Sequence, residues 1–311
     1  MLQTVFRPHL RGARLEGMTE ALHRAVRHYA DAHADAAGFA ATPLQGVGMM
    51  RAYAPTGIMR SIYRPLVCLI LQGTKQVTVG QHTYEFAAGQ SAIVGADVPV
   101  VSRITRASRS EPYLALAIEL DVTLLLDLSA QIGGSDGSGA ATPAVLVDDT
   151  EAAVTDCALR LMRLLERTEA IALLRPSIAR ELHYWLLAGR HGRAVRGFAH
   201  PNGVAHRIAH AVAILRDEFD RPLRMERLAA AAGMSASTFH HHFRTVTSLS
   251  PLQFQKQLRL IEARRRMLGD GLSASRAAFE VGYESVSQFT REYGCMFGVP
   301  PGRDMSESRA A

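Results

Sequence analysis

Hydrophobic positions along the chain follow two spacings that alternate in blocks. Between residues 15 and 37 the apolar side chains recur every three to four positions, as on the buried stripe of an amphipathic helix. From about residue 46 to 120 the pattern changes to short apolar or alternating runs that are cut by turn residues. Helical spacing returns at about residue 150 and continues, with one interruption, to about residue 297. The pattern predicts a β-rich region followed by a long helical one.

The β-rich block contains several runs of strand length, separated by turn pairs such as Gly73-Thr74 and Ala88-Gly89. Many short strands at this spacing are typical of a sandwich or a small barrel. The predicted strands are Leu66–Gln72, Lys75–Val79, Thr83–Phe86, Ser91–Val94, Val98–Thr105 and Tyr113–Glu119.

Glycine-rich stretches divide the rest of the chain. Residues 133–143 are rich in glycine and serine, and we expect them to form a flexible surface loop. One helix is expected over 150–166, and another starts at Pro176, because proline is accepted at the first position of a helix. Residues 189–205 hold four glycines, a proline and an asparagine, which predicts a linker between two domains.

A helix-turn-helix pattern spans Leu228–Phe243. Gly233 can take the positive φ that is needed where one helix stops, and the Ser235 hydroxyl can accept backbone N–H bonds at the start of the next. Phe239 and Phe243 are four positions apart, so we expect both to face inward. The outward side chains of the second helix are Ser237, His240, His241 and Arg244.

The same arrangement recurs over Ala277–Tyr293. Gly282 ends a helix, Ser285 caps the next, and Phe289 and Tyr293 are expected to face the core. The side chains left to face a groove are Val286, Ser287, Gln288, Thr290 and Arg291. Two such patterns in tandem indicate a protein that reads two successive stretches of DNA major groove.

A single helix is predicted to join the two patterns. It starts at Ser250 and Pro251, an N-cap followed by a first-turn proline, and runs to about Leu268. At 1.5 Å per residue it is about 27 Å long. A rod of this length can hold two reading helices close to one DNA turn apart, which is roughly 34 Å.

Composition adds little that is specific. The net charge of +6 divides into +4 over residues 201–311 and +2 over residues 1–200, so charge alone does not mark a nucleic-acid-binding half. We find no stretch of the roughly 18–20 apolar residues that a membrane span needs, and no signal peptide. The three cysteines are far apart and form no CxxC pair, which favours free thiols in a reducing cytoplasm.

The stretch from about 205 to 304 resembles the DNA-binding domain of the AraC/XylS family of bacterial transcription regulators. The segments that carry the resemblance are Ser250–Leu260, Val281–Ser285, Ser287–Tyr293 and Phe297–Pro301. It implies that both recognition helices enter the major groove on one face of the duplex. By position, it implies base contacts from Ser237, His240, His241, Val286, Ser287, Gln288, Thr290 and Arg291. We expect phosphate contacts from Arg244, Lys256, Arg264 and Arg265.

The chemistry of these positions suits base recognition. Arg291 can pair bidentately with guanine, Gln288 with adenine, and Val286 with a thymine methyl group. A solvated surface also carries small side chains such as Ser237, and the arginine run 264–266 is equally compatible with a solvated helix face. The three adjacent histidines at 240–242 do not predict a metal site, because neighbouring helical residues diverge by about 100°.

The segment 44–121 resembles the N-terminal domain of one branch of the same family. The matching segments are Pro65–Lys75, Gly80, Gly89-Gln90, Asp97–Pro99 and Pro112–Ala115. The resemblance implies a cupin-like β-barrel followed by helices, with a small-molecule site, a dimer interface, or both. We therefore expect an α+β chain with three parts. These are a ligand-sensing and dimerisation domain over 1–190, a linker over 191–204 and a DNA-binding domain with two helix-turn-helix units over 205–304.

Three functions fit these features. The leading hypothesis is a cytoplasmic regulator, an activator by family resemblance, which binds double-stranded operator DNA as a homodimer and responds to a small-molecule effector in its barrel. The family also implies RNA polymerase as a partner. One alternative is a constitutive DNA-binding regulator whose barrel only dimerises. The other is a cupin-type enzyme.

The enzyme alternative lacks a ligand set in the sequence. A metal site needs at least three convergent ligands. The barrel stretch offers only His82 and, three residues on, Glu85, which point to opposite faces of a strand. We expect no metal and no cofactor. Cys68 lies in an apolar strand, which favours an inert thiol over a reactive sensor, and alkylation of Cys68 is the test of that alternative.

Overall fold

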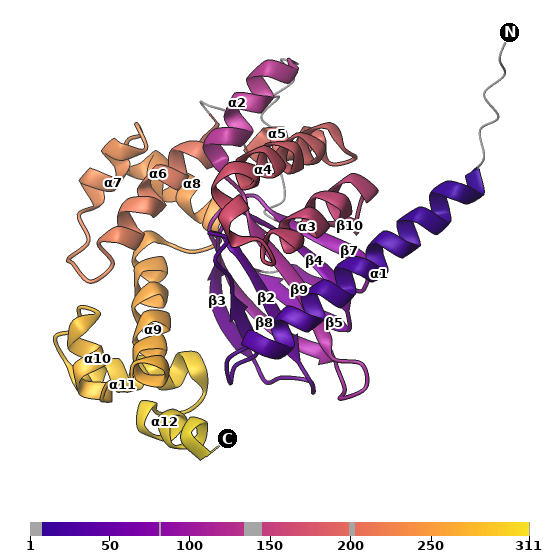
Figure 1. Ribbon diagram of the computed structural model, residues 1–311. Helices are drawn as coiled ribbons and strands as arrows, with labels where there is room; N and C mark the ends of the chain where they lie inside the picture. The colour runs from indigo at the N-terminus through magenta and orange to yellow at the C-terminus, as the bar shows by residue number, and fades with distance from the viewer. Residues whose placement is uncertain (1–7, 81, 134–144, 199–202, 311) are drawn as a thin grey trace, which may run out of the picture.

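The structure, a computed structural model, describes residues 8–80, 82–133, 145–198 and 203–310. In the N-terminal domain two antiparallel sheets face each other (Figure 1). The larger sheet has the strand order β1-β2-β9-β4-β7-β10 and the smaller has the order β3-β8-β5-β6. The strands are β1 Phe39–Ala41, β2 Val47–Ala52, β3 Met59–Tyr63, β4 Leu66–Gln72, β5 Thr74–Val79, β6 His82–Ala87, β7 Gln90–Val94, β8 Val98–Arg106, β9 Tyr113–Glu119 and β10 Val145–Asp149.

The six strands expected from the sequence are confirmed, and the fold class is as predicted. Four further strands, β1, β2, β3 and β10, are added to them. β1 is three residues long and β3 is partly buried along its whole length, so neither has the alternation that marks a strand. The predicted loop over 133–143 lies, beyond Gly133, outside the described residues.

Strand β4 separates two hydrophobic clusters. Ile70, together with the partly buried Leu66 and Cys68, packs between the two sheets. Val67 and Leu69 point to the other face, where they join the cluster under the helices. Each apolar residue of β4 thus contributes to one of two cores, as the alternation of side chains along a strand requires.

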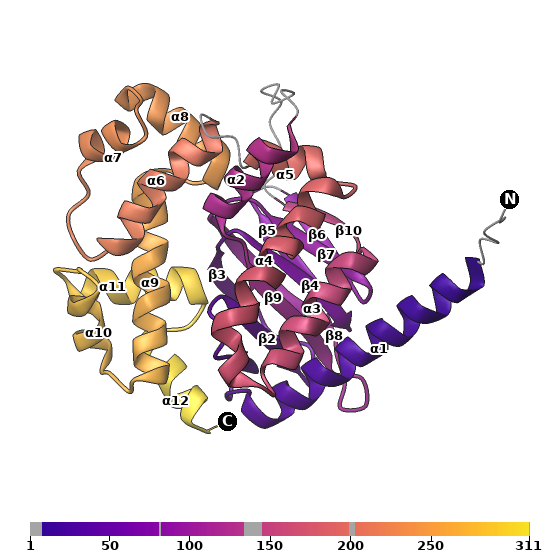
Figure 2. The ribbon, with the colours of Figure 1, turned by 45° about the horizontal axis from the view of Figure 1, so that its top comes forward.

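Helices cover the outer face of the larger sheet (Figures 1 and 2). Leu22 and Val26 of the first helix are fully buried, and so are Cys157 and Leu182 of two later helices. The helices of this domain are α1 Pro8–His33, α2 Val122–Ile132, α3 Ala152–Leu164, α4 Ile171–Ala188 and α5 Gly192–Phe198, with a short 3₁₀ turn at Thr168–Ala170.

Two sequence predictions about this region need correction. Helix α4 begins at Ile171 rather than at Pro176, which lies inside the helix. Because this proline lies in the second turn, it removes one backbone hydrogen bond near the N-terminus of the helix, and the helix continues past it. Part of the predicted linker forms α5, and Val195 of that helix is fully buried in the N-terminal core. The glycine content of this segment predicted a linker, but the burial of Val195 stabilises a helix there.

The C-terminal domain is helical and has two small cores. The first contains Phe239, Phe243 and Phe254, and the second contains Phe289 and Tyr293, all fully buried. Its helices are α6 Val204–Asp217, α7 Met225–Ala231, α8 Ala236–Thr247, α9 Pro251–Gly269, α10 Ala274–Glu280, α11 Val286–Phe297 and α12 Pro301–Ala310. The sequence analysis predicted α9 but not α12.

The two domains touch along the smaller sheet. Ile62 of β3 packs against the first helical core, and Val246 of α8 packs against both that core and the cluster between the sheets. Asp97 is 8% exposed, and it accepts a hydrogen bond of 2.5 Å from Arg216 of α6. In Figures 1 and 2 the C-terminal helices accordingly lie beside β3. The first helix-turn-helix unit is thus in contact with the N-terminal domain.

Candidate DNA-binding surface

The first helix-turn-helix unit, formed by α7 and α8, has the local geometry that its sequence predicts. Gly233 has φ of 60°, and the Ser235 hydroxyl accepts a hydrogen bond of 3.3 Å from the Thr238 N–H. Phe239 and Phe243 are fully buried and their ring centroids lie 5.4 Å apart. Arg207 of α6 donates to the carbonyl of Ala232 at 2.7 Å, which fixes the turn to the preceding helix.

The second unit, formed by α10 and α11, repeats this geometry. Gly282 has φ of 88°, and the Ser285 hydroxyl accepts a hydrogen bond from the Gln288 N–H at 3.3 Å. Phe289 and Tyr293 are buried, with ring centroids 5.4 Å apart. The predicted caps, turns and inward aromatic residues are therefore confirmed in both units.

Helix α9 joins the units through a complete capping box. The Ser250 hydroxyl accepts from the Gln253 N–H, and the Gln253 side chain accepts from the Ser250 N–H at 3.1 Å. Pro251 occupies the first turn. The 19 residues of α9 span about 28 Å at 1.5 Å per residue, close to the length expected from the sequence.

One arginine of α9, which sequence reasoning missed, joins the α6–α7 loop to the turn of the second unit. Arg259 donates to the carbonyls of Phe219 and Arg221, which follow α6, at 2.6 Å and 3.0 Å. The same guanidinium donates to the carbonyl of Gly282, in the second turn, at 2.8 Å. Burial lowers the pKa of Arg259, although Tyr283 and nearby carboxylates act in the opposite direction. A guanidinium that binds three carbonyls restricts how the units move relative to each other.

The predicted base-contact residues of the first unit lie on its surface. Ser237, His240 and His241 are exposed side chains of α8. Arg244, the predicted phosphate contact that follows them, is exposed as well. Among the residues that the structure describes, no acidic side chain lies within ion-pair distance of Arg244. This face of α8 is available to a ligand.

In the second unit the predicted residues are less uniform. Ser287, Thr290 and Arg291 are exposed, whereas Val286 is partly buried. Gln288 is exposed but donates to Glu292 at 3.2 Å, a contact that base recognition would have to replace. Within the described part of the chain, Arg291 has no carboxylate partner.

Three predicted phosphate contacts, Lys256, Arg264 and Arg265, form ion pairs within the protein. Lys256 pairs with Glu292 at 2.9 Å, and Arg265 pairs with Glu262 and Asp270 at 2.9 Å and 3.2 Å. These pairs lie at the surface, where an ion pair contributes little and exchanges readily. They leave Lys256 and Arg265 as possible phosphate contacts.

Arg264 is held more firmly. Its guanidinium donates two hydrogen bonds to Asp304 of α12, at 2.8 Å and 3.1 Å, and stacks 5.0 Å from the Phe297 ring centroid. The Tyr293 hydroxyl donates to the same carboxylate at 2.5 Å. Because bidentate pairing occupies the guanidinium, Arg264 fastens α12 to α9, and we no longer count it among the phosphate contacts.

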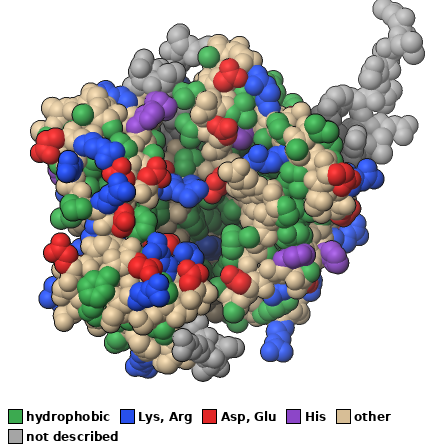
Figure 3. All heavy atoms as spheres, turned by 60° about the vertical axis from the view of Figure 1, so that its left-hand side comes forward, with side chains coloured by type: hydrophobic (Ala, Val, Ile, Leu, Met, Phe, Trp, Pro, Cys, Tyr) green, Lys and Arg blue, Asp and Glu red, His purple; other side chains and the backbone are tan. Residues whose placement is uncertain are grey.

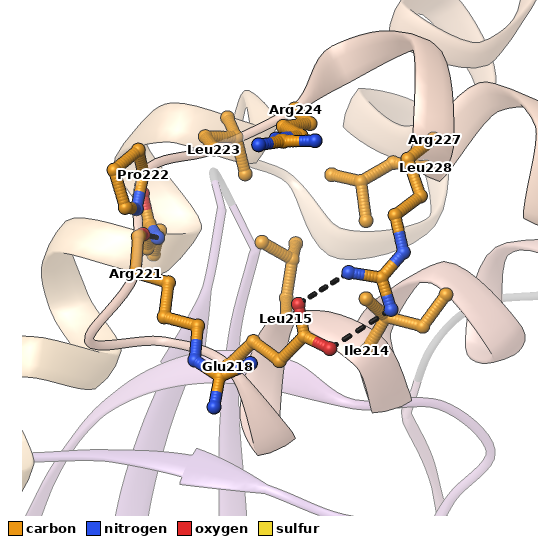
Figure 4. Close-up of a pocket in the computed structure, with 10 residues that line it drawn as sticks. Ile214, Leu215, Glu218, Arg221, Pro222, Leu223, Arg224, Arg227 and Leu228 are labelled. Carbon is orange, nitrogen blue, oxygen red and sulfur yellow. Dashed lines mark hydrogen bonds and ion pairs between the residues drawn. The ribbon is translucent and has the colours of Figure 1, made fainter.

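A pocket of about 260 Å³ lies beside the first unit, between the end of α6 and the start of α7 (Figure 4). Glu218 binds Arg227 through both carboxylate oxygens, at 2.5 Å and 2.8 Å. The exposed Arg221 and Arg224 lie around the same pocket. The pocket thus carries a local excess of positive charge at its rim.

Charge is mixed elsewhere on this side of the molecule. Figure 3 shows basic and acidic side chains interspersed over the visible face, which is hollowed near its centre. No single basic stripe dominates the view. Hydrogen-bonding side chains on α8 and α11 therefore define the candidate surface better than net charge does.

The residues considered for a cupin-type metal site or a reactive thiol lie in the N-terminal domain. His82 and Glu85 of β6 are both exposed, so neither lines the space between the sheets. Cys68 is partly buried, and burial raises the pKa of its thiol to about 11. A thiol with such a pKa is almost wholly protonated at neutral pH. Among the described helices, none combines the length and the apolar character that a bilayer-spanning helix needs.

Comparisons with known proteins agree with this geometry. The family model of the AraC-type transcriptional regulator N-terminus matches residues 43–194, and a helix-turn-helix domain model matches residues 228–306. The chain is similar to the transcriptional activator RhaS of Escherichia fergusonii, with 29% identity over 105 residues. It is also similar to the virulence regulon transcriptional activator VirF of Yersinia enterocolitica, with 32% identity over 78 residues.

These sequence matches are partial. They cover 34% and 25% of this chain, and 37% and 29% of the relatives. Among solved structures, unsaturated fatty acid-bound ToxT of Vibrio cholerae matches over 84% of this chain and 93% of its own, with a TM-score of 0.60 and 10% identity. That likeness concerns the two-domain fold. With both domains matched by their family models, the chain belongs to the AraC family of transcription regulators.

Proposed function

We propose that this protein activates transcription by binding operator DNA through α8 and α11, under the control of a small-molecule effector bound by the N-terminal domain. The observation that carries the proposal is the repetition of one capped helix-turn-helix geometry in two units, each with polar side chains exposed on its second helix. Repetition of this kind suits two neighbouring segments of major groove.

The proposed base contacts differ between the units. In the first, Ser237, His240 and His241 offer hydrogen-bonding groups to base edges, with Arg244 as a phosphate contact. In the second, the exposed and unpaired Arg291 suits guanine, because its planar guanidinium matches the O6 and N7 acceptors. The other base contacts of the second unit are Val286, Ser287, Gln288 and Thr290, with Lys256 and Arg265 as phosphate contacts.

The direct contact between domains supports control by an effector. Asp97 pairs with Arg216 of α6, which shares a core with α8, and Val246 of α8 packs against the sheets, so a change at the sheets has a physical route to α8. ToxT, which shares this fold, has been solved with an unsaturated fatty acid and with a naphthalenyl butenoic acid. An effector site distinguishes this proposal from a constitutive regulator whose N-terminal domain only dimerises.

Activation and dimerisation rest on the relatives and on one exposed surface. RhaS and VirF are both described as activators, which makes RNA polymerase the expected partner at the promoter.

On α4, Leu173 is 78% exposed and Leu174 is 50% exposed. We propose this apolar face as part of a homodimer interface, because exposed leucines of this kind are typical of association surfaces. Sedimentation at micromolar concentration should therefore show a dimer, and a persistent monomer contradicts it.

The test of DNA recognition is the variant Arg291→Ala. After genomic mapping of bound sites supplies an operator, the variant should bind it more weakly by roughly 1–3 kcal/mol at fixed salt, with relaxed preference at one base pair. Arg109→Ala is the matched control, because it removes the same charge from an exposed loop of the N-terminal domain. Equal operator affinity of Arg291→Ala and the control would reject the proposed role.

A further inference from the structure

Lysine is almost absent from this protein. Of its 35 basic residues other than histidine, the sequence holds only two lysines, Lys75 and Lys256, and the rest are arginines. Lys256 lies at the surface of the C-terminal domain and pairs with Glu292. Lys75 lies in the sheet-rich domain. A chain that otherwise uses arginine for positive charge thus has an ammonium group at one position between its sheets.

Strand geometry places Lys75 on the inner face of the smaller sheet. Val77 and Val79, which follow it at alternate positions in β5, are buried in the cluster between the sheets. Lys75 pairs across the strands with Phe86 of β6 and with Ile104 of β8, which belong to the same cluster. Its side chain therefore shares a mainly apolar interior.

Polar groups from both sheets lie around this ammonium, Tyr63 from the same sheet and Cys68 and Tyr113 from the facing one. The Lys75 nitrogen lies 5.6 Å from the centroid of the Tyr63 ring, and Tyr63 packs against the inner cluster. Cys68 and Tyr113 are electrostatic neighbours in the same interior. Burial acts to lower the pKa of Lys75, but Tyr63, through charge and a hydrogen bond, and Cys68 outweigh it, so that pKa is raised. The amine is therefore protonated at neutral pH.

This positive charge lacks a negative partner. Across the described residues, no carboxylate lies within 4.0 Å of the Lys75 nitrogen. Glu85, on the neighbouring strand β6, is exposed. Asp97 is paired with Arg216. Withdrawing a charge from water without a counter-ion is unfavourable, so such a group is commonly kept for a ligand.

We propose that Lys75 anchors the anionic group of the effector inside the sheet-rich domain, with Tyr63 beside it as a second hydrogen-bonding group. The surrounding cluster is apolar, so the ligand class is an organic carboxylate with a hydrophobic body. Tyr63, Cys68 and Lys75 are each only partly buried, so each of these side chains keeps some contact with solvent. The inference rests on the proposed control by an effector and names its chemistry.

An ammonium suits this position better than a guanidinium. It is compact, its stem is flexible, and its three donors can divide between Tyr63 and a carboxylate. An arginine would need more donors satisfied in the same apolar space. This difference explains why the position holds one of only two lysines in the chain.

Binding of matched ligands tests the inference. The probes are straight-chain and aryl-substituted carboxylates of four to eighteen carbons, each compared with its neutral amide. Carboxylates should raise the Tm of the full chain, and the amides should raise it much less. Lys75→Met should lose the shift, whereas Lys256→Met, the matched control, should keep it. Both variants should show the circular dichroism spectrum of the parent protein.

Other outcomes overturn the inference in distinguishable ways. If neutral compounds stabilise the parent and Lys75→Met equally, an effector exists and Lys75 is not its anchor. If no carboxylate shifts the Tm while operator binding is intact, Lys75 does not anchor an anionic effector and this inference fails, whereas control by an effector of another class still stands. A lower Tm of Lys75→Met without ligand, with an unchanged response to carboxylates, would give Lys75 a structural role.

Chemical labelling gives a second measurement that does not depend on the variants. Because only two lysines exist, reductive methylation followed by peptide mass spectrometry reports on each separately. A stabilising carboxylate should slow methylation of Lys75 at least several-fold and leave that of Lys256 unchanged. Equal protection of both lysines, or of neither, contradicts binding at Lys75.

Discussion

The two helix-turn-helix units share a construction rule but differ in their surroundings. In each, an arginine from the preceding helix binds a carbonyl of the turn, Arg207 in the first and Arg259 in the second. The first unit then packs against the sheet-rich domain through Val246 of α8, and Arg216 of the preceding helix α6 pairs with Asp97 of that domain. The second is closed by α12, whose Asp304 binds Arg264 and Tyr293. One unit is thus supported by another domain and the other by its own terminal helix.

This difference assigns separate tasks to units of similar sequence. The first unit can respond to changes in the N-terminal domain because it touches that domain directly. The second has its own buried polar network and needs no such support. We infer that effector control acts mainly on the position of α8, while α11 provides a constant part of the DNA affinity.

The largest expected effect comes from the glycines of the two turns. At Gly282 a β-carbon would lie 2.0 Å from the carbonyl oxygen of Asp220, with φ of 88°. At Gly233 the nearest atom, on the flexible Arg207 side chain, would lie 3.3 Å away. We expect Gly282→Ala to destabilise the C-terminal domain by roughly 3 kcal/mol or more and Gly233→Ala by about 1 kcal/mol.

The single tryptophan makes this comparison measurable. Trp185 lies in α4, so its fluorescence follows the N-terminal domain, whereas circular dichroism follows the helices of both domains. Urea unfolding of Gly282→Ala should show an earlier loss of helix with little change in the fluorescence transition. Equal destabilisation by the two alanines would show that the turns are equally crowded.

A smaller effect is expected from the closure of the second unit. Asp304→Asn removes the charge that binds Arg264, and we expect a loss of about 2 kcal/mol after allowing for the partial exposure of Arg264. Burial tends to raise the pKa of Asp304, but Arg264 and Tyr293 outweigh it and lower that pKa. The carboxylate therefore stabilises the fold at pH values above its ordinary pKa of 3.8 and loses this effect as pH falls through the lower folded value.

The measurement is a series of unfolding experiments by circular dichroism between pH 3 and 7. The parent protein should become less stable toward the acid end, and Asp304→Asn should lack that part of the pH dependence. Glu262→Gln, which breaks surface pairs of α9 with Arg265 and Arg266, serves as a control and should change stability less. A larger loss of stability in Glu262→Gln than in Asp304→Asn would contradict the proposed role of Asp304 in holding α12 against α9.

The smallest effect is expected between the domains. Burial raises the pKa of Asp97 even though Arg216 acts to lower it, so the pair contributes little net stability. A double-mutant cycle with Asp97→Asn and Arg216→Ala should give a coupling energy of about 1 kcal/mol. Asp97 with Arg227, which binds Glu218 instead, is the control cycle and should give none. Absence of coupling in both cycles would remove the proposed route between the sheets and α8.

Local chemistry made much of this molecule predictable from sequence. Capping serines, turn glycines and paired aromatic residues depend on neighbours within a few positions, so Ser235, Gly282 and Phe289 could be placed correctly. Strands with clear alternation, such as β4, were predictable for the same reason. Helix α5 was not, because the burial of Val195 depends on tertiary packing against α4 and α2, which the local pattern does not specify.

Long-range polar contacts escaped sequence reasoning. Arg259 looks like any other basic residue of α9 until the fold brings Phe219 and Gly282 beside it. Arg264, one of three consecutive arginines, was predicted to contact phosphate, and only the position of Asp304 shows that it is also paired within the protein. For Arg259 the sequence shows only an arginine in a helix, flanked by apolar residues, and this does not specify its partner.

The hold of Arg259 on the α6–α7 loop and on the turn of the second unit has a consequence for the promoters this protein can use. Hydrogen bonds from one guanidinium to three carbonyls limit how far the reading helices can spread apart or swivel. Since B-DNA turns once in about 10 base pairs, inserting five between the two recognised sub-sites would carry the second around to the far side of the double helix. Operators of this regulator should therefore tolerate changes in base identity far better than changes in spacing.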